Sequence, residues 1–457
     1  MTAEAAPVPT VPGGWLLGSA TALQDDQLAT YLDAMHTHGS HVRFRVGPPR
    51  IGFVFDAVFS PEGARQVLGA REDRWIKQAP VLDEFTHLFG EGLGSSTGHL
   101  WLTHRRILQP VFTRRHVEQS MRAIVSAAED VVADWVAAGP GAGVDLSDAS
   151  MRYSLRALGR SIFGADDLDR AWPVLQWTLP LLSDHAATRG LAPVRLPRSW
   201  PTPANRRAAR ARRALHELVD DLVRTRRAAT DDHDLLGLLL AARDPDTGRG
   251  LDDREVRDEV LIFLSAGHET TGSSLALVLH LLGRHPRVQH RVREEVRRVL
   301  GDRTPRAADL DDLQYTGQVV DEALRLYPPL HTLVRRAARD TRLLGHEVPE
   351  GRVAAVSTWG IHRNPAVWPD PARFDPTRFD PDRDHDRHAH VPYGAGPRSC
   401  IGVHLATAEL VVAVALVVRA FRLSADDREP ELMAGVTLRS RRPLRAVLVP
   451  PGRAEHD

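Results

Sequence analysis

The residue of this chain most suited to chemistry is Cys400, the only cysteine among 457 residues. Gly394, Gly396 and Gly402 surround it, so the backbone can turn tightly and approach a flat ligand without Cβ clashes. Arg398 places a fixed positive charge two residues upstream. A helical pattern follows, and free N–H groups at a helix N-terminus stabilise a thiolate. The stretch therefore predicts a thiolate that serves as a nucleophile or as a metal ligand.

Several interpretations of Cys400 compete. A small buried hydrophobe is the ordinary role of a lone cysteine. A nucleophile needs a histidine base, and the 22 histidines leave that role open. A zinc site needs a cluster of ligands that the sequence does not show, and "GAGPRS" lacks the third glycine of a dinucleotide loop. We favour a single axial thiolate on a haem iron, with the porphyrin supplying the four equatorial positions.

The stretch around Cys400 resembles the cysteine loop of the cytochrome P450 family, the haem-thiolate monooxygenases. That family's pattern is aromatic-Gly-x-Gly-x-Arg-x-Cys-x-Gly. The residues that match it are Tyr393, Gly394, Gly396, Arg398, Cys400 and Gly402. Tyr393 stands where the family most often has phenylalanine. We expect its ring to pack on the thiolate side of the haem, and its hydroxyl is a candidate for tuning the iron's potential.

A second candidate site lies within the apolar helical run "EVLIFLSAGHETTGSSLALVLHLL". A membrane span is the competing explanation, but the His-Glu-Thr-Thr cluster at its centre would be costly in lipid. Gly267 weakens a helix and threonine hydroxyls compete for backbone carbonyls, so we expect a distortion with room for water. The resemblance implies that Ala266 to Thr271 form the oxygen-binding groove above the haem iron. It also implies that Glu269 and Thr270 relay protons to bound oxygen.

The motif "EALR" places Glu322 and Arg325 three residues apart on one helix face. An exposed ion pair of small energetic value is the ordinary explanation of such spacing. The resemblance implies instead a buried network behind the haem. Arg378 is its expected third member, because "PTRF" matches the family's Pro-x-Arg-Phe segment. We expect this network to lock the loop that presents Cys400.

The haem propionates need cationic or N–H donors, because a buried carboxylate requires partners. Trp101 and Arg105 match the family's Trp-x-x-x-Arg helix. Arg335 matches a further propionate arginine, with Arg336 the less fitting choice, and Arg398 is another candidate. The cofactor that the resemblance implies is haem b.

The elements that must position these residues follow from periodicity. "HVRFRVG" and "RIGFVFD" alternate as a strand hairpin should, and residues from about 100 to 330 are mostly helical. Residues 340–379 are strand-like and rich in proline, and one more helix follows Cys400. We therefore expect a mainly α fold with a minor β part, the cytochrome P450 fold, with a long central helix over the haem. We expect a single domain over 1–457, comprising a Pro/Gly-rich segment at 1–20, a small sheet from about 40–60 and 340–360, and the meander and cysteine loop at about 365–400.

Composition narrows the class of protein further. Lys+Arg and Asp+Glu are both 59, which gives no drive toward nucleic acid or an acidic membrane. One cysteine excludes an internal disulfide framework and fits a reducing compartment. The N-terminus has neither a signal-peptide pattern nor an apolar run long enough to span a membrane. These features predict a soluble, cytoplasmic protein without a membrane span, and the dominance of arginine among the basic residues points to a bacterial source.

The activity implied by the resemblance inserts one oxygen atom from O2 into an apolar substrate. We expect hydroxylation of a terpenoid or polyketide in specialised metabolism; a fatty-acid hydroxylase, a peroxide-dependent peroxygenase and a non-catalytic haem sensor are the alternatives. The short stretch after Cys400 leaves no room for a flavin or iron–sulfur domain, so ferredoxin and ferredoxin reductase are the expected electron donors to a monomer. The docking patch that we expect comprises Arg105, Arg106, Arg114 and Arg115.

The substrate pocket is expected, by analogy, to use residues 74–93, residues 171–193 and Ala266. It should also include the four residues after "YPP", namely Leu330, His331, Thr332 and Leu333. His331 and Thr332 are candidate polar anchors in an otherwise apolar cavity that suits a lipophilic small molecule.

Overall fold

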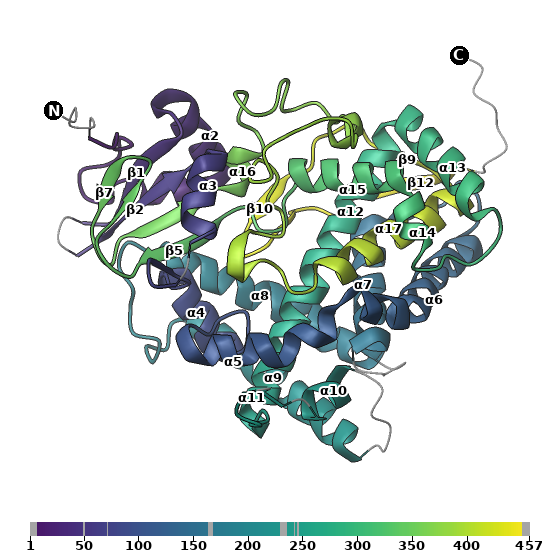
Figure 1. Cartoon of the computed structure of the whole chain (residues 1–457), viewed down its shortest axis with the longest axis horizontal. Coiled ribbons are helices and arrows are strands. Elements are labelled where there is room, and N and C mark those ends of the chain that lie inside the picture. The colour runs from purple at the N-terminus through teal and green to yellow at the C-terminus, as the bar shows by residue number, and fades with distance from the viewer. Residues whose placement is uncertain are drawn as a thin grey trace.

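Helices occupy most of the described chain and the strands form small sheets, which confirms the predicted mainly α fold with a minor β part (Figure 1). The computed structural model describes residues 7–48, 51–70, 72–162, 168–228, 235–241, 243–244 and 246–449. Residues 1–6 of the expected N-terminal segment, Pro49 of the expected hairpin turn and residues 450–457 lie outside the described residues.

The helices before the central helix are α1 (Ala20–Asp25), α2 (Gln27–His38), α3 (Pro61–Leu68), α4 (Pro80–Phe89), α5 (Gly98–Leu108), α6 (Arg114–Ala138), α7 (Leu146–Ile162), α8 (Trp172–Gly190), α9 (Pro203–Ala228) and α10 (Leu235–Ala241). The central helix and those after it are α11 (Asp253–Phe263), α12 (Glu269–Arg284), α13 (Pro286–Leu300), α14 (Asp309–Asp312), α15 (Gln314–Leu326), α16 (Thr358–Ile361) and α17 (Val403–Ala420). Short 3-10 turns are η1 (Gln109–Phe112), η2 (Leu168–Ala171), η4 (Pro376–Phe379) and η5 (Gly396–Arg398).

The strands are β1 (His41–Val46), β2 (Phe53–Val58), β3 (Trp75–Ile76), β4 (Gly143–Asp145), β5 (Leu333–Ala337), β6 (Thr341–Leu343), β7 (His346–Val348), β8 (Val353–Val356), β9 (Arg422–Ala425), β10 (Leu432–Ala434), β11 (Leu438–Ser440) and β12 (Arg445–Val449). The largest sheet has the order β1-β2-β8-β5-β3 and lies at one end of the molecule (Figure 1). β1 and β2 are antiparallel, with Phe44 opposite Phe55, which confirms the predicted hairpin.

The strands expected at 340–360 divide between two sheets. β6 and β7 pair only with each other, whereas β8 runs parallel to β2 and antiparallel to β5. This pairing places the N-terminal hairpin in the same sheet as β5, the strand that carries Arg335, with β8 between them. The β10–β11 pair and the three-stranded sheet β4-β12-β9, in which β4 joins two C-terminal strands, complete the β part.

A long helical segment runs through the centre of the molecule, from α11 to α12 (Figure 1). It begins with a capping box, in which Asp252 accepts from the Glu255 backbone N–H and Glu255 accepts from that of Asp252. Most residues of α12 are buried, because α7, α15 and α17 pack around it. This central position explains why the run is apolar over so many residues.

α17 is the one helix in the described chain that is long and apolar enough to cross a membrane. Two thirds of it, 67%, is buried inside the protein, where it packs against α6, α12, α13 and α15. Its apolar composition is therefore explained by its place in the core directly behind the Cys400 loop.

Candidate functional site

Cys400 lies in a loop that needs glycine at two positions. Gly394 and Gly396 have φ of 71° and 70°, in the left-handed region that glycine adopts without strain. A Cβ at Gly396 would lie 2.1 Å from the Leu68 carbonyl oxygen, so no larger side chain fits there. The Cys400 N–H donates to the Tyr393 carbonyl at 2.9 Å, and the Cys400 side chain is exposed. The loop thus presents a sulfur atom at a fixed place just before α17.

The hydroxyl of Tyr393 faces α17 and not the sulfur. It lies 3.3 Å from the Thr407 hydroxyl, and burial raises its pKa above the usual range, so it stays a neutral phenol. Its direct partner in the described structure is therefore a helix side chain.

A fully buried ion pair lies on α15, at the motif that was expected to lock this loop. The Arg325 guanidinium binds both carboxylate oxygens of Glu322, at 2.6 and 2.8 Å, and neither side chain has exposed surface. Arg325 also donates to the carbonyls of His362, Pro371 and Arg373, at 2.6, 2.9 and 3.2 Å. The two side chains therefore tie α15 to the irregular segment that leads to the cysteine loop.

Arg378 lies in the same network. Its Nε is 3.4 Å from Glu322 Oε1, and its other nitrogens donate to the carbonyls of Pro369 and Asp370 at 2.7 and 2.8 Å. The Asp375 N–H donates to the same Glu322 oxygen at 2.8 Å. The geometry thus brings together the three charged residues that the two motifs singled out.

Several cations converge on the space beside Cys400. Arg105 donates to the Ser399 carbonyl at 3.2 Å. Arg398 lies 4.0 Å from the centre of the Trp101 ring, donates to the Ser96 carbonyl at 2.8 Å and binds Glu72 through Nε at 2.7 Å. Arg335 is buried and lines an apolar cavity whose wall also includes Ala266 and Thr270. Arg336 points away from this cavity and binds Gln78.

Lys77 is a further cation at this place that the sequence motifs did not identify. It lines the cavity, and its ammonium donates to the Gly94 carbonyl at 2.6 Å. Burial, together with the positive charges of Arg335 and Arg398, lowers its pKa to about 7. One sequence signal was available: Lys77 is the only lysine of the chain, whose other basic side chains are arginine and histidine.

The side chain of Cys400 is exposed, yet protein surrounds its sulfur closely. This desolvation raises the pKa of the thiol, whereas the Gly402 backbone N–H, Arg105 and Lys77 lower it. A metal cation bound to the sulfur would favour the thiolate further, since a coordinating thiol is deprotonated outright.

On the opposite side, the central helix widens into a π-helical turn, η3 (Leu264–His268), between α11 and α12. Three hydroxyl contacts account for it: Thr270 donates to the Ala266 carbonyl, and Ser154 on α7 contacts the carbonyls of Gly267 and His268 at 3.2 and 3.0 Å. A Cβ at position 267 would lie 2.7 Å from Leu158, so glycine permits this close packing. The distortion expected from "AGHETT" is present.

The two expected proton-relay residues face different ways. Thr270 and Ala266 line the cavity, whereas Glu269 is buried and forms an ion pair with Arg439 at 3.3 Å. Burial raises the pKa of Glu269, and the Arg439 guanidinium opposes that rise. Next to this pair, burial lowers the pKa of His268 to about 4, so its ring is neutral.

A second buried carboxyl group lies close to the same turn of the helix. Burial raises the pKa of Glu409 on α17 to about 8, with Thr271 opposing the rise through a side-chain hydrogen bond. At neutral pH Glu409 is therefore mostly protonated. No motif in the sequence marks this residue.

An apolar cavity of about 1350 Å³, part of it open to solvent, lies beside Ala266 and Thr270. All three expected regions contribute to its wall, through α4, α8 and the residues from Leu330 to Leu333. Further lining regions were not expected, among them the N-terminal part, with Tyr31, Phe53 and Phe55, and the turn between β10 and β11. These come from opposite ends of the chain, so only the fold brings them together.

His331 is already used by the protein. Its Nε2 donates to the Gly435 carbonyl at 3.0 Å, and its Nδ1 accepts from the Thr332 hydroxyl at 2.9 Å. Burial lowers its pKa, so the ring is neutral. Neither nitrogen is free as a polar anchor for a ligand.

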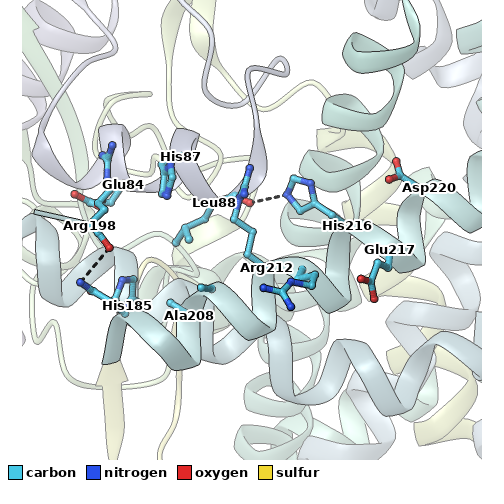
Figure 2. A pocket seen from close by; sticks show the side chains of 13 residues that line it. Glu84, His87, Leu88, His185, Arg198, Ala208, Arg212, His216, Glu217 and Asp220 are labelled. Atoms are coloured by element: carbon cyan, nitrogen blue, oxygen red, sulfur yellow. Dashed lines mark hydrogen bonds and ion pairs between the residues drawn. The ribbon is translucent and has the colours of Figure 1, made fainter. Parts of the chain in front are cut away.

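A second cavity, of about 900 Å³, lies between α4, α8 and α9 and is lined by charged and polar side chains (Figure 2). It contains three histidines, and His216 on α9 contacts the Leu88 carbonyl at 3.2 Å. Glu84 there is bound to Arg189 and Arg198, at 3.0 and 3.1 Å. Four of its lining residues, Glu84, His87, Leu88 and His185, fall within the ranges expected for the substrate pocket, but none of the residues expected at the haem lines it.

The residues around Cys400 fit a haem. Among the four cations at this place, only Arg398 is paired with a carboxylate in the described residues. Lys77, Arg105 and Arg335 are thus left to carbonyl and amide oxygens, and two propionate groups would satisfy them. The flat approach at Gly394 and the exposed sulfur suit a planar ligand with a central metal.

The family model for cytochrome P450 matches residues 8–446. The chain belongs to the cytochrome P450 family. It is a haem-iron monooxygenase that takes electrons from a redox partner and acts on a lipophilic substrate.

Three relatives illustrate the range of similarity. Cyclooctat-9-en-7-ol 5-monooxygenase of Streptomyces melanosporofaciens is 38% identical over 91% of this chain and 89% of its own length. Pentalenene oxygenase of Streptomyces avermitilis is 32% identical over 92% and 93%. Leukotriene-B4 omega-hydroxylase 3 of Mus musculus is 32% identical over 82% and 76%.

Replacing Arg325 by alanine should destabilise this P450 by about 3–5 kcal/mol, because it leaves the Glu322 carboxylate buried without a partner. We expect loss of haem during purification together with a lower unfolding midpoint, measured by haem absorbance and circular dichroism.

Arg65→Ala is the matched control. Arg65 pairs with Glu62 at the same three-residue spacing, at 2.5 Å, but both side chains are about half exposed. This variant should unfold like the parent and retain haem. Equal stability of the two variants would contradict a locking role for Arg325.

Proposed function

We propose that this P450 hydroxylates a terpenoid in specialised metabolism, using haem b. The observation that carries the proposal is the apolar cavity that ends at Ala266 and Thr270, on the side of the central helix where it widens. Two of the relatives above act on terpenoids by name, which supports this substrate class. The protein's own role is to exclude water and to hold the substrate near the reacting centre.

In this proposal Cys400 is the axial ligand of the haem iron. Trp101, Arg105, Arg335 and Arg398 hold the propionates, and Lys77 joins them. Tyr393, Gly394 and Ala266 contact the macrocycle. When bound, haem supplies the activation of O2, which the thiolate favours by donating electron density. Glu322, Arg325 and Arg378 keep the cysteine loop in place.

Proton delivery falls to Glu269 and Thr270. Thr270 faces the cavity, so its hydroxyl is placed to pass a proton toward bound oxygen. Glu269 precedes it in the helix and exchanges protons with the interior behind the cavity. The presence of both residues favours a monooxygenase over a peroxide-dependent enzyme.

A fatty-acid substrate is the second candidate, and one relative is named for an action on leukotriene B4. A carboxylate substrate needs a cation in the pocket. The cations that line the cavity are Lys77 and Arg335, which are assigned here to the propionates. An uncharged terpenoid therefore fits the remaining apolar wall better.

The substrate class is tested by incubating the holoenzyme with reductant, a ferredoxin and its reductase. Cyclooctat-9-en-7-ol, pentalenene and leukotriene B4 serve as probes, and mass spectrometry detects the gain of one oxygen atom. We expect turnover and a shift of the haem spectrum toward high spin with a terpenoid. Turnover of the leukotriene alone would contradict the terpenoid assignment.

We also infer that the chain is a single P450 domain over 1–457, and that it works as a soluble monomer in a bacterial cytoplasm, with ferredoxin and ferredoxin reductase as electron donors.

The proposed docking patch lies on the side of the cysteine loop, because Arg105 at its edge reaches the Ser399 carbonyl. Arg106 and Arg114 are exposed but have acidic neighbours: Asp246 at 2.5 Å and Asp311 at 3.8 Å. Arg115 is also exposed.

Reversing the charge at Arg114 and Arg115 should slow reduction by an acidic ferredoxin about tenfold at low salt and flatten its salt dependence. Stopped-flow reduction under carbon monoxide measures this. Arg224→Glu on α9, an equally exposed arginine far along the chain, is the control and should leave the rate unchanged. An unchanged rate in the double variant would remove the patch from the docking surface.

A further inference from the structure

One guanidinium lies between two carboxylates behind the cavity. Arg439, on β11, is only 11% exposed, and its NH1 is 3.3 Å from Glu269 Oε1 on α12. Its NH2 is 2.5 Å from Asp184 Oδ2 on α8. The Asp184 side chain is 40% exposed, whereas that of Glu269 is 3% exposed. The shorter contact is therefore made to the residue that water can also reach.

The hairpin that carries Arg439 is fixed in place by other contacts. The Leu438 N–H donates to the Pro329 carbonyl at 2.8 Å, and His331 holds the Gly435 carbonyl at 3.0 Å. A Cβ on Gly435 would lie 2.9 Å from Asp184 Oδ1 and 3.2 Å from Arg439 NH1. The hairpin turn thus packs directly on the ion pair, and the same turn lines the cavity.

α8 connects the ion pair to the cavity from the other side. Ala187 and Gly190 line the cavity, and Ala187 follows Asp184 by three residues, on a neighbouring part of the helix surface. A ligand in the cavity would therefore contact the helix that carries Asp184. Arg439 is carried by β11 and not by α8, so it would remain beside Glu269 if α8 moved.

We propose that Arg439 is a positioning residue for Glu269, and that Asp184 competes with Glu269 for its guanidinium. The place of α8 over the cavity then sets how firmly Glu269 is held in an ion pair. With α8 as observed, Asp184 draws the guanidinium toward itself and leaves Glu269 more loosely bound. With α8 displaced, Glu269 keeps the cation alone. This inference rests on the proposed role of Glu269 in proton delivery.

The charges around Glu269 give the two partners opposite effects. Burial raises its pKa, Arg439 lowers it and Asp184 raises it. The other titratable groups near this turn are neutral: His268, His331 and, at neutral pH, mostly Glu409. Removing Asp184 should therefore lower the pH at which Glu269 ionises, and removing Arg439 should raise it.

The test is an infrared titration of carboxyl bands in the ferric holoenzyme, with Glu269→Gln used to assign the band of Glu269. Asp184→Asn should move its midpoint to lower pH, and Arg439→Gln should move it to higher pH. Arg439→Lys keeps the charge and should lie between the parent and Arg439→Gln. Arg442→Gln, next to the same hairpin but 74% exposed and paired with Glu431, should leave the midpoint unchanged.

A midpoint that stays unchanged in Asp184→Asn and Arg439→Gln, or moves the same way in both, overturns the proposal. The titration requires no turnover, so it is independent of the substrate. If Glu269→Gln retains full coupling of electrons to product, the proton-delivery role of Glu269 fails, whatever the titration shows about Arg439.

Discussion

Glu322 and Arg325 form an ion pair in which neither side chain has exposed surface. Removing two charges from water costs free energy, and this cost is offset only while both charges and the surrounding carbonyls stay in place. The segment around Pro371 and Arg373 that they hold is irregular backbone, outside any helix or strand. Arg325 satisfies three of its carbonyls, and Glu322 accepts one of its N–H groups. We propose that the cysteine loop, and therefore the sulfur, is kept in place by this pair.

The site on either side of the haem position follows one electrostatic pattern. Near the cysteine loop, burial and the neighbouring positive charges lower the pKa of Lys77, and the excess of cations over carboxylates favours an anionic ligand. Behind the cavity, Glu269 and Asp184 share the one guanidinium of Arg439. Between these two charged regions lies an apolar cavity. His331 lines it, but both ring nitrogens of His331 are already hydrogen-bonded to the protein. A lipophilic substrate that must be kept dry fits this arrangement.

The sequence predicted the parts of the site that lie within short motifs. Three such motifs are the Cys400 loop, the Glu322–Arg325 pair and the helix around Gly267. In each, the residue types and their spacing indicate the chemistry, and the periodicity of the surrounding sequence indicated the fold class. Arg439, Asp184 and Ser154 belong to no motif, and they reach the central helix only through the packing of α7, α8 and β11. The π-helical turn needed Ser154, which lies more than a hundred residues away. Lys77 stands out in the sequence as the only lysine, but the sequence does not show that its side chain points toward the cavity.

The central claim is that Cys400 ligates a haem iron through a thiolate. The absorbance difference spectrum of the reduced, carbon-monoxide-bound protein, recorded beside that of Cys400→Ser, tests it most directly. The account predicts a strongly red-shifted Soret band in the parent that is absent from the variant. A protein that binds no haem, or a band typical of histidine ligation in both, would contradict it.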